Sequence, residues 1–579
     1  MRTATEHKFR AEDGLELFYR AWLPREGKTE RAVLLFHRGH EHSGRFQEMV
    51  ESLDLPQVAF FAWDCRGCGQ SPGPRGDADG LAQLESDMDA FLRHLKAEYG
   101  IVEESTVVVA HSVAAVVAGL WALDYAPRLA GLVLATPALE VKLYVPFARE
   151  GLAVLSRFGL MTTVSSYVRG GALTHDKVQA RAYDNDPLIC KEISTRVLLD
   201  LDRGAKRLLK EAGGIAIPTQ VLAARADWVV KNKPVRRLFR RLGSPCKEIR
   251  VYKDLFHAVF HEKGRDQVFQ DVRAFLLASW QRPLQTEFLR RSDIDGPSAE
   301  RYEWLKAGPP RLSLANAVWK ATRLSMRSLG RASQGVRLGL RAGFSSGETL
   351  DYVYQNRPRG FTPFGRAVDK YYLDSPGWKG IRQRRRHLET LLDEALAGVK
   401  APQERATRLV DIAGGPGRYL LDWLSGHSER WLEVLVRDAD AAGLMAGQTK
   451  AQAQGEKRIT YQKGDAFDPT DLASVGPVEI GIVSGLYELF PDNGPVRQSL
   501  AGLAQAVVRG GYLIYTNQPS HPQLELIAET LTHGDGSPWI MRCRSGAEMD
   551  ELVREAGFAK LRTLVDRHGI FTVTLAQRL

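Results

Sequence analysis

Residues 107–115 read V-V-V-A-H-S-V-A-A, a β-branched run that ends at a serine and continues into helix-forming residues. A nucleophilic serine on an α/β sheet needs such a sharp strand-to-helix turn, with small neighbours that let the hydroxyl project. Ala110 and Ala114 occupy the two positions where glycine is usual in this turn. The stretch therefore predicts a mostly parallel sheet with Ser112 as a candidate nucleophile, against the alternative of a plain buried serine.

Short apolar runs and helical stretches alternate on both sides of this turn, up to about residue 280. We expect strands at 32–36, 57–63, 106–110, 131–135, 219–224 and 248–252, and helices at 77–99 and 113–125. This alternation is typical of a doubly wound sheet with helices on its faces. The stretch 139–209 fits the alternation poorly, and we expect an inserted cap there.

Two further candidates follow Ser112 in the order that a catalytic triad takes on this fold, which is serine, acid and histidine. Asp227 follows the expected strand at 219–224, and His257 follows the strand at 248–252. In a triad, His257 takes the proton of Ser112 and returns it to the leaving group, while Asp227 fixes the imidazole tautomer. Taken singly, Asp227 would be a solvated loop acid and His257 a packed or surface histidine, but the ordered trio favours catalysis.

An oxyanion hole needs two backbone N–H groups, and Val113 supplies the first because it follows the nucleophile. The second is expected from the loop H-R-G-H-E-H-S-G-R-F at 37–46. This loop, together with W-D-C-R-G-C-G-Q-S-P-G-P-R-G at 63–76 and Y-D-N-D-P-L-I at 183–189, resembles the monoacylglycerol lipase/lysophospholipase branch of the α/β-hydrolases. The similarity covers about residues 10–280.

The resemblance implies the triad Ser112, Asp227 and His257, with Gly39 and Val113 as oxyanion donors, and a small-molecule or lipid ester as substrate. Arg38 and the two alanines beside Ser112 depart from the family pattern. They leave a second hypothesis open, in which the hydrolase fold is inactive and serves for binding or membrane docking. Cys65-x-x-Cys68 and the histidines of the 37–46 loop are interpreted as parts of active-site loops, so we expect no metal.

A second alternation begins near residue 405, with strands expected at 408–412, 432–437, 459–463, 479–484, 512–516, 559–565 and 569–576. The run A-T-R-L-V-D-I-A-G-G-P-G-R-Y-L at 406–420 gives a strand, a glycine turn and a helix start. Gly415 and Gly417 would let the backbone approach a nucleotide-like ligand closely. Asp438 ends the next strand, where an acid holds ribose hydroxyls, and Asp465 follows the third. The alternatives are a helix-capping Asp438 and a turn Asp465.

Residues 401–579 resemble the class I S-adenosylmethionine-dependent methyltransferases, which have a Rossmann-like fold. The resemblance implies S-adenosyl-L-methionine as cofactor, with its contacts at Asp411, Gly415, Gly417, Asp438, Asp465 and Ala466. The first three shape the methionine and ribose side, Asp438 holds the ribose, and the last two line the adenine. After the fourth strand, Tyr487 and Glu488 either orient a methyl acceptor or cap and pack the next helix.

The region between these domains is basic. Residues 281–400 contain 22 Lys/Arg and 12 Asp/Glu, which accounts for the net charge of +10 of the whole chain. Within it, 311–331 is predicted to form an amphipathic helix with Ala315, Val318, Trp319, Thr322, Met326 and Leu329 on one face. Lys320, Arg323, Arg327 and Arg331 share the neighbouring face. Such a helix lies on an anionic membrane surface or docks on a domain, and both interpretations stay open.

The sequence thus predicts two doubly wound, mostly parallel α/β domains, joined by a basic helical connector at 285–400 that is also a candidate methyltransferase lid. The hydrolase domain spans 1–284 and the methyltransferase domain 401–579. We expect a bifunctional enzyme acting on lipid-related substrates. The sequence contains no nucleic-acid recognition module, so no nucleic-acid partner is expected. With no secretory signal and no apolar run of about 18 residues, we expect a cytoplasmic protein, with peripheral contact at the inner membrane face as a further hypothesis.

Overall fold

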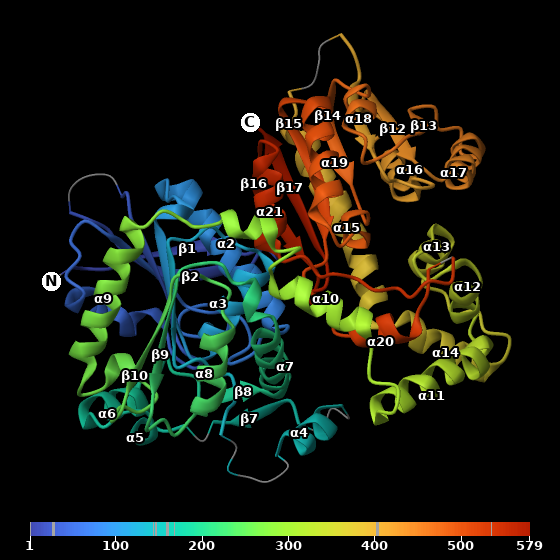
Figure 1. The fold of residues 1–579 in the computed structure, drawn as a ribbon. Coiled ribbons are helices and arrows are strands. Elements are labelled where there is room, and N and C mark those ends of the chain that lie inside the picture. Colours follow the sequence, from blue (N-terminus) through green and yellow to red (C-terminus); the bar gives the residue numbers. More distant parts are fainter. Residues whose placement is uncertain are drawn as a thin grey trace. The chain divides into compact units, whose positions relative to one another are not determined.

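The structure is a computed structural model that describes residues 2–25, 29–142, 144, 148–157, 161–166, 168–400, 404–533 and 535–579. The chain divides into two compact units, Met1–Thr286 and Glu287–Leu579. Each unit is built around one sheet (Figure 1).

The first unit contains an eight-stranded sheet in the order β1-β2-β4-β3-β5-β6-β9-β10. Its strands are β1 (Thr5–Arg10), β2 (Glu16–Trp22), β3 (Ala32–Phe36), β4 (Ala59–Trp63), β5 (Thr106–His111), β6 (Gly131–Ala135), β9 (Thr219–Ala224) and β10 (Lys247–Tyr252). β1 and β2 are antiparallel to their neighbours, and the other strands pair in parallel. The predicted fold class is therefore confirmed, and the antiparallel pair at the start of the sheet is an addition to it.

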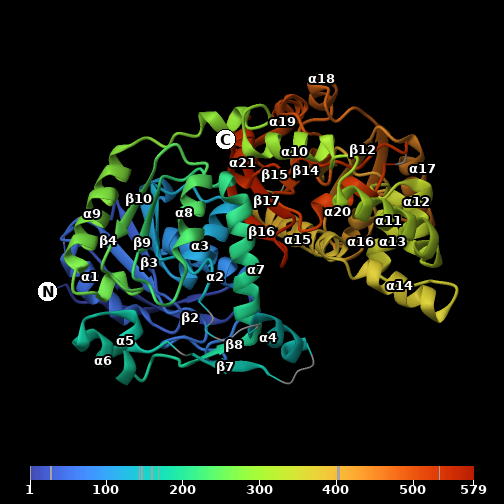
Figure 2. The ribbon, with the colours of Figure 1, turned by 60° about the horizontal axis from the view of Figure 1, so that its bottom comes forward.

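Helices cover both faces of this sheet, with α1 and α9 on one side and α2, α3, α7 and α8 on the other (Figure 2). Their bounds are α1 (Gln47–Ser52), α2 (Leu81–Tyr99), α3 (Val113–Asp124), α7 (Thr195–Glu211), α8 (Asn232–Arg241) and α9 (Arg265–Gln281). Alternate strand residues point to opposite faces, so Val33, Leu35, Val107 and Val109 share one buried cluster with the apolar residues of α1 and α9. This double cover explains why the central strands read as continuous apolar runs.

The insertion between β6 and β9 contains small elements before α7. These are α4 (Ala148–Arg157), β7 (Thr163–Ser165), α5 (Gly170–Leu173), α6 (Lys177–Asn185) and β8 (Glu192–Ser194). β7 and β8 pair as a separate two-stranded sheet. The predicted cap at 139–209 thus corresponds to these elements and α7, and residues 143, 145–147, 158–160 and 167 of it lie outside the described residues.

The second unit contains a seven-stranded sheet in the order β13-β12-β11-β14-β15-β17-β16. Its strands are β11 (Thr407–Asp411), β12 (Leu432–Asp438), β13 (Ile459–Lys463), β14 (Val478–Val483), β15 (Val507–Asn517), β16 (Phe558–Val565) and β17 (Thr572–Arg578). Strands β11 to β15 are parallel, and β17 lies antiparallel between β15 and β16. The helices that follow β11 are α16 (Arg418–Ser425), α17 (Ala441–Ala453), α18 (Pro469–Ala473), α19 (Asn493–Ala506), α20 (Leu524–Thr530) and α21 (Gly546–Glu555).

The region predicted as a connector belongs to the second unit, which corrects its description as a segment between domains. It forms α10 (Pro297–Ala307), α11 (Leu314–Ser328), α12 (Gln334–Ala342), α13 (Gly347–Gln355), α14 (Pro363–Leu373) and α15 (Pro376–Gly398). Leu388, Leu391 and Leu392 of α15 are buried in the core of the sheet. Apolar residues of α12, α13 and α15 share a further cluster with α20. Positive charge marked this region in the sequence, but its buried apolar faces decide where it packs.

Helix α11 docks on α20 through part of the predicted amphipathic face, and its contact with a membrane surface stays a prediction. Trp319, Thr322 and Met326 are partly buried on the side towards α20, and Arg323 donates to the Glu529 carbonyl at 2.8 Å. Val318, predicted on the docked stripe, is 59% exposed. Among the described residues, no helix combines the length and the apolar character that a membrane span requires.

Candidate active sites

Ser112 lies at the turn between β5 and α3, with φ 58° and ψ −111°. Its Oγ is 2.8 Å from Nε2 of His257, and Nδ1 of His257 is 2.8 Å from Oδ2 of Asp227. All three side chains are buried. The structure therefore brings the three predicted triad residues into one hydrogen-bonded chain.

Backbone contacts hold the two partners of Ser112 in place. Oδ1 of Asp227 accepts from the N–H groups of Val229 and Val230 at 2.7 and 2.9 Å. Burial would raise the pKa of Asp227, but the His257 imidazole and these two N–H donors hold it below its ordinary value. A charged Asp227 accepts a hydrogen bond from the Nδ1–H of His257, which leaves Nε2 free to accept the serine proton.

The two predicted oxyanion donors lie beside each other. A Cβ built on Gly39 would come within 3.2 Å of Cγ2 of Val113. Val113 begins α3, so its N–H has no acceptor within the helix. Both residues line a small cavity of about 50 Å³, together with Cys65 and Cys68 of the 63–76 loop. Neither Ser112 nor His257 lines this cavity, so the role of Gly39 and Val113 as oxyanion donors stays a prediction.

Arg38, which replaces a family glycine, is directed into a buried ion pair. Its guanidinium lies 2.9 Å from Oε1 of Glu41 and 4.5 Å from the ring centroid of Tyr183. Tyr183 belongs to the 183–189 cap motif, and Asp186 of the same motif lies 2.9 Å from Nε2 of His42. The oxyanion loop and the cap motif are therefore tied together by polar contacts. Sequence reasoning missed Glu41, although its three-residue spacing from Arg38 is a usual ion-pair signal.

In the second unit, the glycine turn after β11 contacts the acid at the end of β12. Oδ2 of Asp438 accepts from the Gly415 N–H at 2.8 Å, and Oδ1 accepts from the Asp440 N–H at 2.8 Å. Gly415 and Gly417 have φ of 52° and 61°, in the left-handed region that favours glycine. The predicted turn and ribose acid are thus adjacent.

Asp411, at the end of β11, is a buried carboxylate with an incomplete hydrogen-bond set. Oδ2 accepts from the Tyr419 hydroxyl at 2.7 Å, while Oδ1 has no partner among the described residues. Burial raises the pKa of Asp411 to about 7, although the Tyr419 hydrogen bond acts in the opposite direction. An unpaired buried oxygen beside an open glycine turn fits a ligand that brings an ammonium group, as the methionine part of S-adenosylmethionine does.

Asp465 and Ala466 lie in the loop after β13. Asp465 is exposed, and its Oδ1 accepts from the Phe467 N–H at 2.9 Å, as expected of a turn residue. Ala466 is partly buried against a core cluster of the unit. No described hydrogen bond links Asp465 to Asp438 or to the glycine turn, so its role at an adenine stays a prediction.

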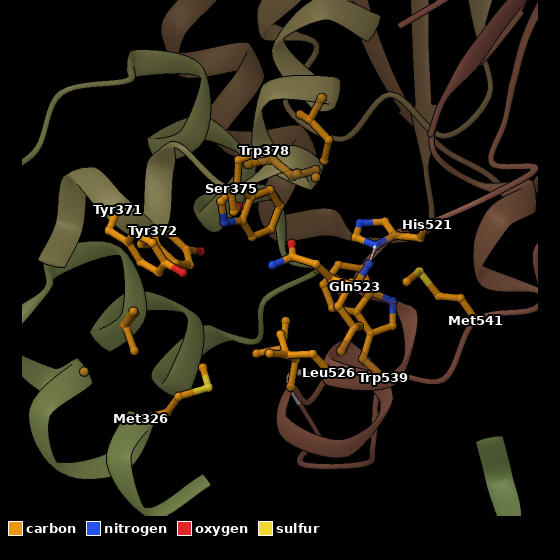
Figure 3. A pocket seen from close by; sticks show the side chains of 18 of the residues that line it. Met326, Tyr371, Tyr372, Ser375, Trp378, His521, Gln523, Leu526, Trp539 and Met541 are labelled. Carbon is orange, nitrogen blue, oxygen red and sulfur yellow. Dashed lines mark hydrogen bonds between the residues drawn. The ribbon is translucent and has the colours of Figure 1, made fainter. Parts of the chain in front are cut away.

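A cavity of about 500 Å³ lies at the carboxyl ends of β14 and β15 (Figure 3). Glu488 lines it, whereas the hydroxyl of the neighbouring Tyr487 donates to Ser499 inside the core at 2.9 Å. Tyr487 therefore packs in the core, as one of the two alternatives for this segment expected. Glu488 instead faces the cavity, where a bound molecule could contact it. Sequence reasoning missed the other polar wall residues, Arg384 and His521, because their positions depend on the packing of α15 and of the segment after β15.

Helix α13 borders the glycine turn, and its role as a lid stays a prediction. Asp351 pairs with Arg418, the residue after Gly417, at 2.9 Å. A Cβ on Gly347 would lie 3.7 Å from Cδ of Pro416 in the turn. The neighbouring Leu350 lines the large cavity. These contacts place α13 beside both the turn and the cavity.

A family model described as "Putative methyltransferase" matches residues 272–578, which is more than half of the chain. The chain belongs to this methyltransferase family. The match includes α10 to α15, in agreement with their position in the second unit. Membership implies a methyl donor of the S-adenosylmethionine type. A second model, "Serine aminopeptidase, S33", matches residues 27–264.

One relative spans the whole of this methyltransferase-family chain, and two others match its first half. "Uncharacterized protein YnbC" of Escherichia coli (strain K12) is 45% identical over 580 residues, covering all of this chain and 99% of that protein. The monoglyceride lipase of Rattus norvegicus is 25% identical over 43% of this chain and 82% of that enzyme. The monoacylglycerol lipase of Mycolicibacterium smegmatis is 23% identical over 48% of this chain and 98% of that enzyme. The predicted fusion of a hydrolase-fold domain with a methyltransferase-family domain is confirmed.

Proposed function

We propose that the chain is a bifunctional enzyme, a serine ester hydrolase in its first unit and an S-adenosylmethionine-dependent methyltransferase in its second. The observation that carries the first activity is the hydrogen-bonded chain from Ser112 through His257 to Asp227. Lipid-type esters are the favoured substrates because relatives of the first unit are named as monoglyceride lipases. Methyltransferase-family membership carries the second activity.

In the proposed hydrolysis, Ser112 attacks the ester carbonyl while His257 Nε2 takes the hydroxyl proton. The charge on Asp227 stabilises the imidazolium that forms. The carbonyl oxygen becomes negative and is held by the N–H groups of Gly39 and Val113. His257 then returns the proton to the leaving alcohol, and water releases the acyl group by the same steps in reverse.

In the second unit, S-adenosylmethionine would supply a methyl group on a positively charged sulfur. Asp411 would accept a hydrogen bond from its ammonium, and the glycine turn would allow close backbone approach. Asp438 would hold the ribose hydroxyls, and Asp465 with Ala466 would line the adenine. The chain contributes chiefly by holding donor and acceptor in line, because correct orientation alone lowers the barrier substantially.

Labelling by a fluorophosphonate probe tests the hydrolase. We expect the wild-type chain to react and Ser112→Ala to be inert. Asp227→Asn should react roughly 10⁴-fold more slowly, because the imidazole then takes the wrong tautomer. A wild-type chain that does not react would favour the other hypothesis, an inactive hydrolase fold that serves for binding or membrane docking.

Calorimetric titration with S-adenosylmethionine tests the methyltransferase. We expect wild-type binding that Asp438→Ala weakens by about tenfold or more, because two ribose hydrogen bonds are lost. Asp422→Ala, which removes an exposed carboxylate on α16, is a matched control and should bind normally. No measurable binding by the wild-type chain would contradict the proposal.

A further inference from the structure

The large cavity in the second unit has mostly apolar walls. Met326, Trp378, Leu526 and Trp539 come from α11, α15, α20 and the segment after α20, and they surround the space (Figure 3). Its volume of about 500 Å³ lies within the usual range for small-molecule sites. The cavity therefore has room for a molecule with a substantial apolar body.

One end of the cavity carries a buried ion pair. Nη1 of Arg384 lies 3.5 Å from Oε1 of Glu488, and each residue is only 6% exposed. Oε1 of Glu488 also accepts from the Thr516 hydroxyl at 2.7 Å. Oε2 of Glu488 and Nε of Arg384 are buried and have no hydrogen-bond partner among the described residues. Unpaired buried polar atoms are costly, so this end is prepared for a polar group.

The charges of the pair select the kind of group. The Arg384–Glu488 pair is neutral overall, so a carboxylate or an ammonium would add an unbalanced charge to a desolvated site, which is costly. A hydroxyl is neutral, and it both donates and accepts hydrogen bonds. It can donate to Glu488 Oε2 while it accepts from Arg384. A methyl ether, which only accepts, would leave Glu488 unpaired.

The polar end lies at the same sheet edge as the proposed cofactor site. Glu488 follows β14, and Asp411 ends β11, the strand paired in parallel with β14. Carboxyl ends of adjacent parallel strands meet at one edge. Helix α13 joins the two places, since Leu350 lines the cavity and Asp351 pairs with Arg418 after the glycine turn.

We propose that this cavity is the methyl-acceptor site and that it takes an apolar molecule bearing an alcohol or phenol hydroxyl. The inference rests on the proposed methyltransferase function and names its substrate class. In the transfer, the hydroxyl oxygen bonds to the methyl carbon as the carbon–sulfur bond breaks, and the electron pair of that bond stays on sulfur. The hydroxyl proton passes to Oε2 of Glu488, which is a base within the cavity wall.

A dye-displacement experiment tests the preference of the cavity for a hydroxyl head group. The neutral dye Nile red is displaced from the full-length chain in the absence of cofactor. The competitors are dodecan-1-ol, 1-methoxydodecane, dodecanoate and dodecylamine, which share one tail and differ in the head group. We expect dodecan-1-ol to displace the dye at about tenfold lower concentration than the others, since one buried hydrogen bond is worth about that factor. An ether that matches the alcohol, or a preference for the acid or amine, would overturn the proposal.

Glu488→Gln sharpens the test because it removes the negative charge and keeps the shape. Arg384 is then unopposed, and dodecanoate should overtake dodecan-1-ol. Glu479→Gln is the matched control, because Glu479 is a buried carboxylate of β14 paired with Arg405 and it does not line the cavity. The control should keep the wild-type order. A Glu488→Gln chain that also keeps that order would contradict the assignment.

The competitor series on the wild-type chain needs no variant. It therefore tests the preference of the cavity for a hydroxyl even if Glu488→Gln fails to fold. Titration with S-adenosylmethionine distinguishes a failure of the methyltransferase proposal from a failure of the acceptor assignment. If the alcohol preference holds and the cofactor does not bind, the methyltransferase proposal fails and the hydroxyl site remains. If the cofactor binds and the alcohol has no advantage, only the acceptor assignment is wrong.

Discussion

Ser112 has a backbone conformation that L-residues with a side chain rarely adopt, with φ 58° and ψ −111°. Such strain costs of order 1–3 kcal/mol and persists where the surroundings enforce it. Here β5 and α3 fix the turn, and Ala110 and Ala114 are small enough to pack beside it. The loss of both motif glycines has therefore not changed the geometry that a nucleophile needs.

This strain leads to a stability prediction. Ser112→Gly should raise the free energy of unfolding of the first unit by about 1 kcal/mol relative to Ser112→Ala, because glycine adopts positive φ without a Cβ clash. Both variants lack the hydroxyl, so their difference isolates the backbone effect. Denaturant unfolding of the two variants measures it. Equal stability would mean that the turn is not strained.

Asp411 predicts how cofactor binding depends on pH. Its pKa of about 7 means that the carboxyl is mostly protonated below pH 7 and charged above it. An ammonium ligand binds the charged form, so affinity for S-adenosylmethionine should rise about tenfold per pH unit below 7 and then level off. Calorimetry between pH 5 and 8 measures the slope. Asp411→Asn should bind weakly with little slope, and an unchanged slope in this variant would assign the titration to another group.

At the scale of elements, α11 and α14 both contribute residues to the wall of the large cavity, and both also carry exposed apolar side chains. Leu314 and Leu324 of α11 are exposed, as are Phe364 and Tyr371 of α14. Exposed cations accompany them at Lys320, Arg327, Arg366 and Lys370. Apolar side chains beside cations suit an anionic bilayer surface. We propose that these two helices contact such a surface, from which an apolar acceptor would enter.

Co-sedimentation with vesicles tests this surface. We expect binding to phosphatidylglycerol vesicles that weakens with salt, and little binding to phosphatidylcholine, since each basic residue near an anionic surface contributes about 1 kcal/mol. The double variant Leu314→Ser, Leu324→Ser should bind less. The control Trp431→Ser, Met445→Ser removes exposed apolar residues elsewhere in the unit. Indifference to anionic lipid, or an equal loss in the control, would contradict the proposal.

The sequence predicted the central strands well because buried parallel strands read as short apolar runs. It missed β1, T-E-H-K-F-R, because this strand is largely exposed and carries mostly polar residues, and it also missed β2, although that strand is mostly buried. The triad was predictable from chain order and turn chemistry. Arg384 was not, because a cavity wall depends on which helices meet, whereas the Arg38–Glu41 pair had a signal in its three-residue spacing that was overlooked. The region 285–400 was predicted to lie between the domains because its positive charge was its clearest feature. That charge describes its surface, whereas the buried Leu388 and Leu391 determine its packing in the second unit.

At the scale of the whole molecule, the chain carries two sheets with separate cores and separate candidate sites. Substitutions without shared contacts usually have additive effects. Ser112→Ala should therefore leave affinity for S-adenosylmethionine within about twofold of wild type, and Asp438→Ala should leave fluorophosphonate labelling unchanged. Measuring both properties on both variants checks this. A tenfold cross-effect would show that the two sites are coupled.

The central claim is that one chain carries a reactive serine and a separate cofactor site. Native mass spectrometry of the full-length protein, treated with a fluorophosphonate and then mixed with S-adenosylmethionine, tests both together. We expect a single species with one covalent adduct on Ser112 and one bound S-adenosylmethionine. A protein that gains no adduct, or an adduct-bearing protein that binds no S-adenosylmethionine, would contradict it.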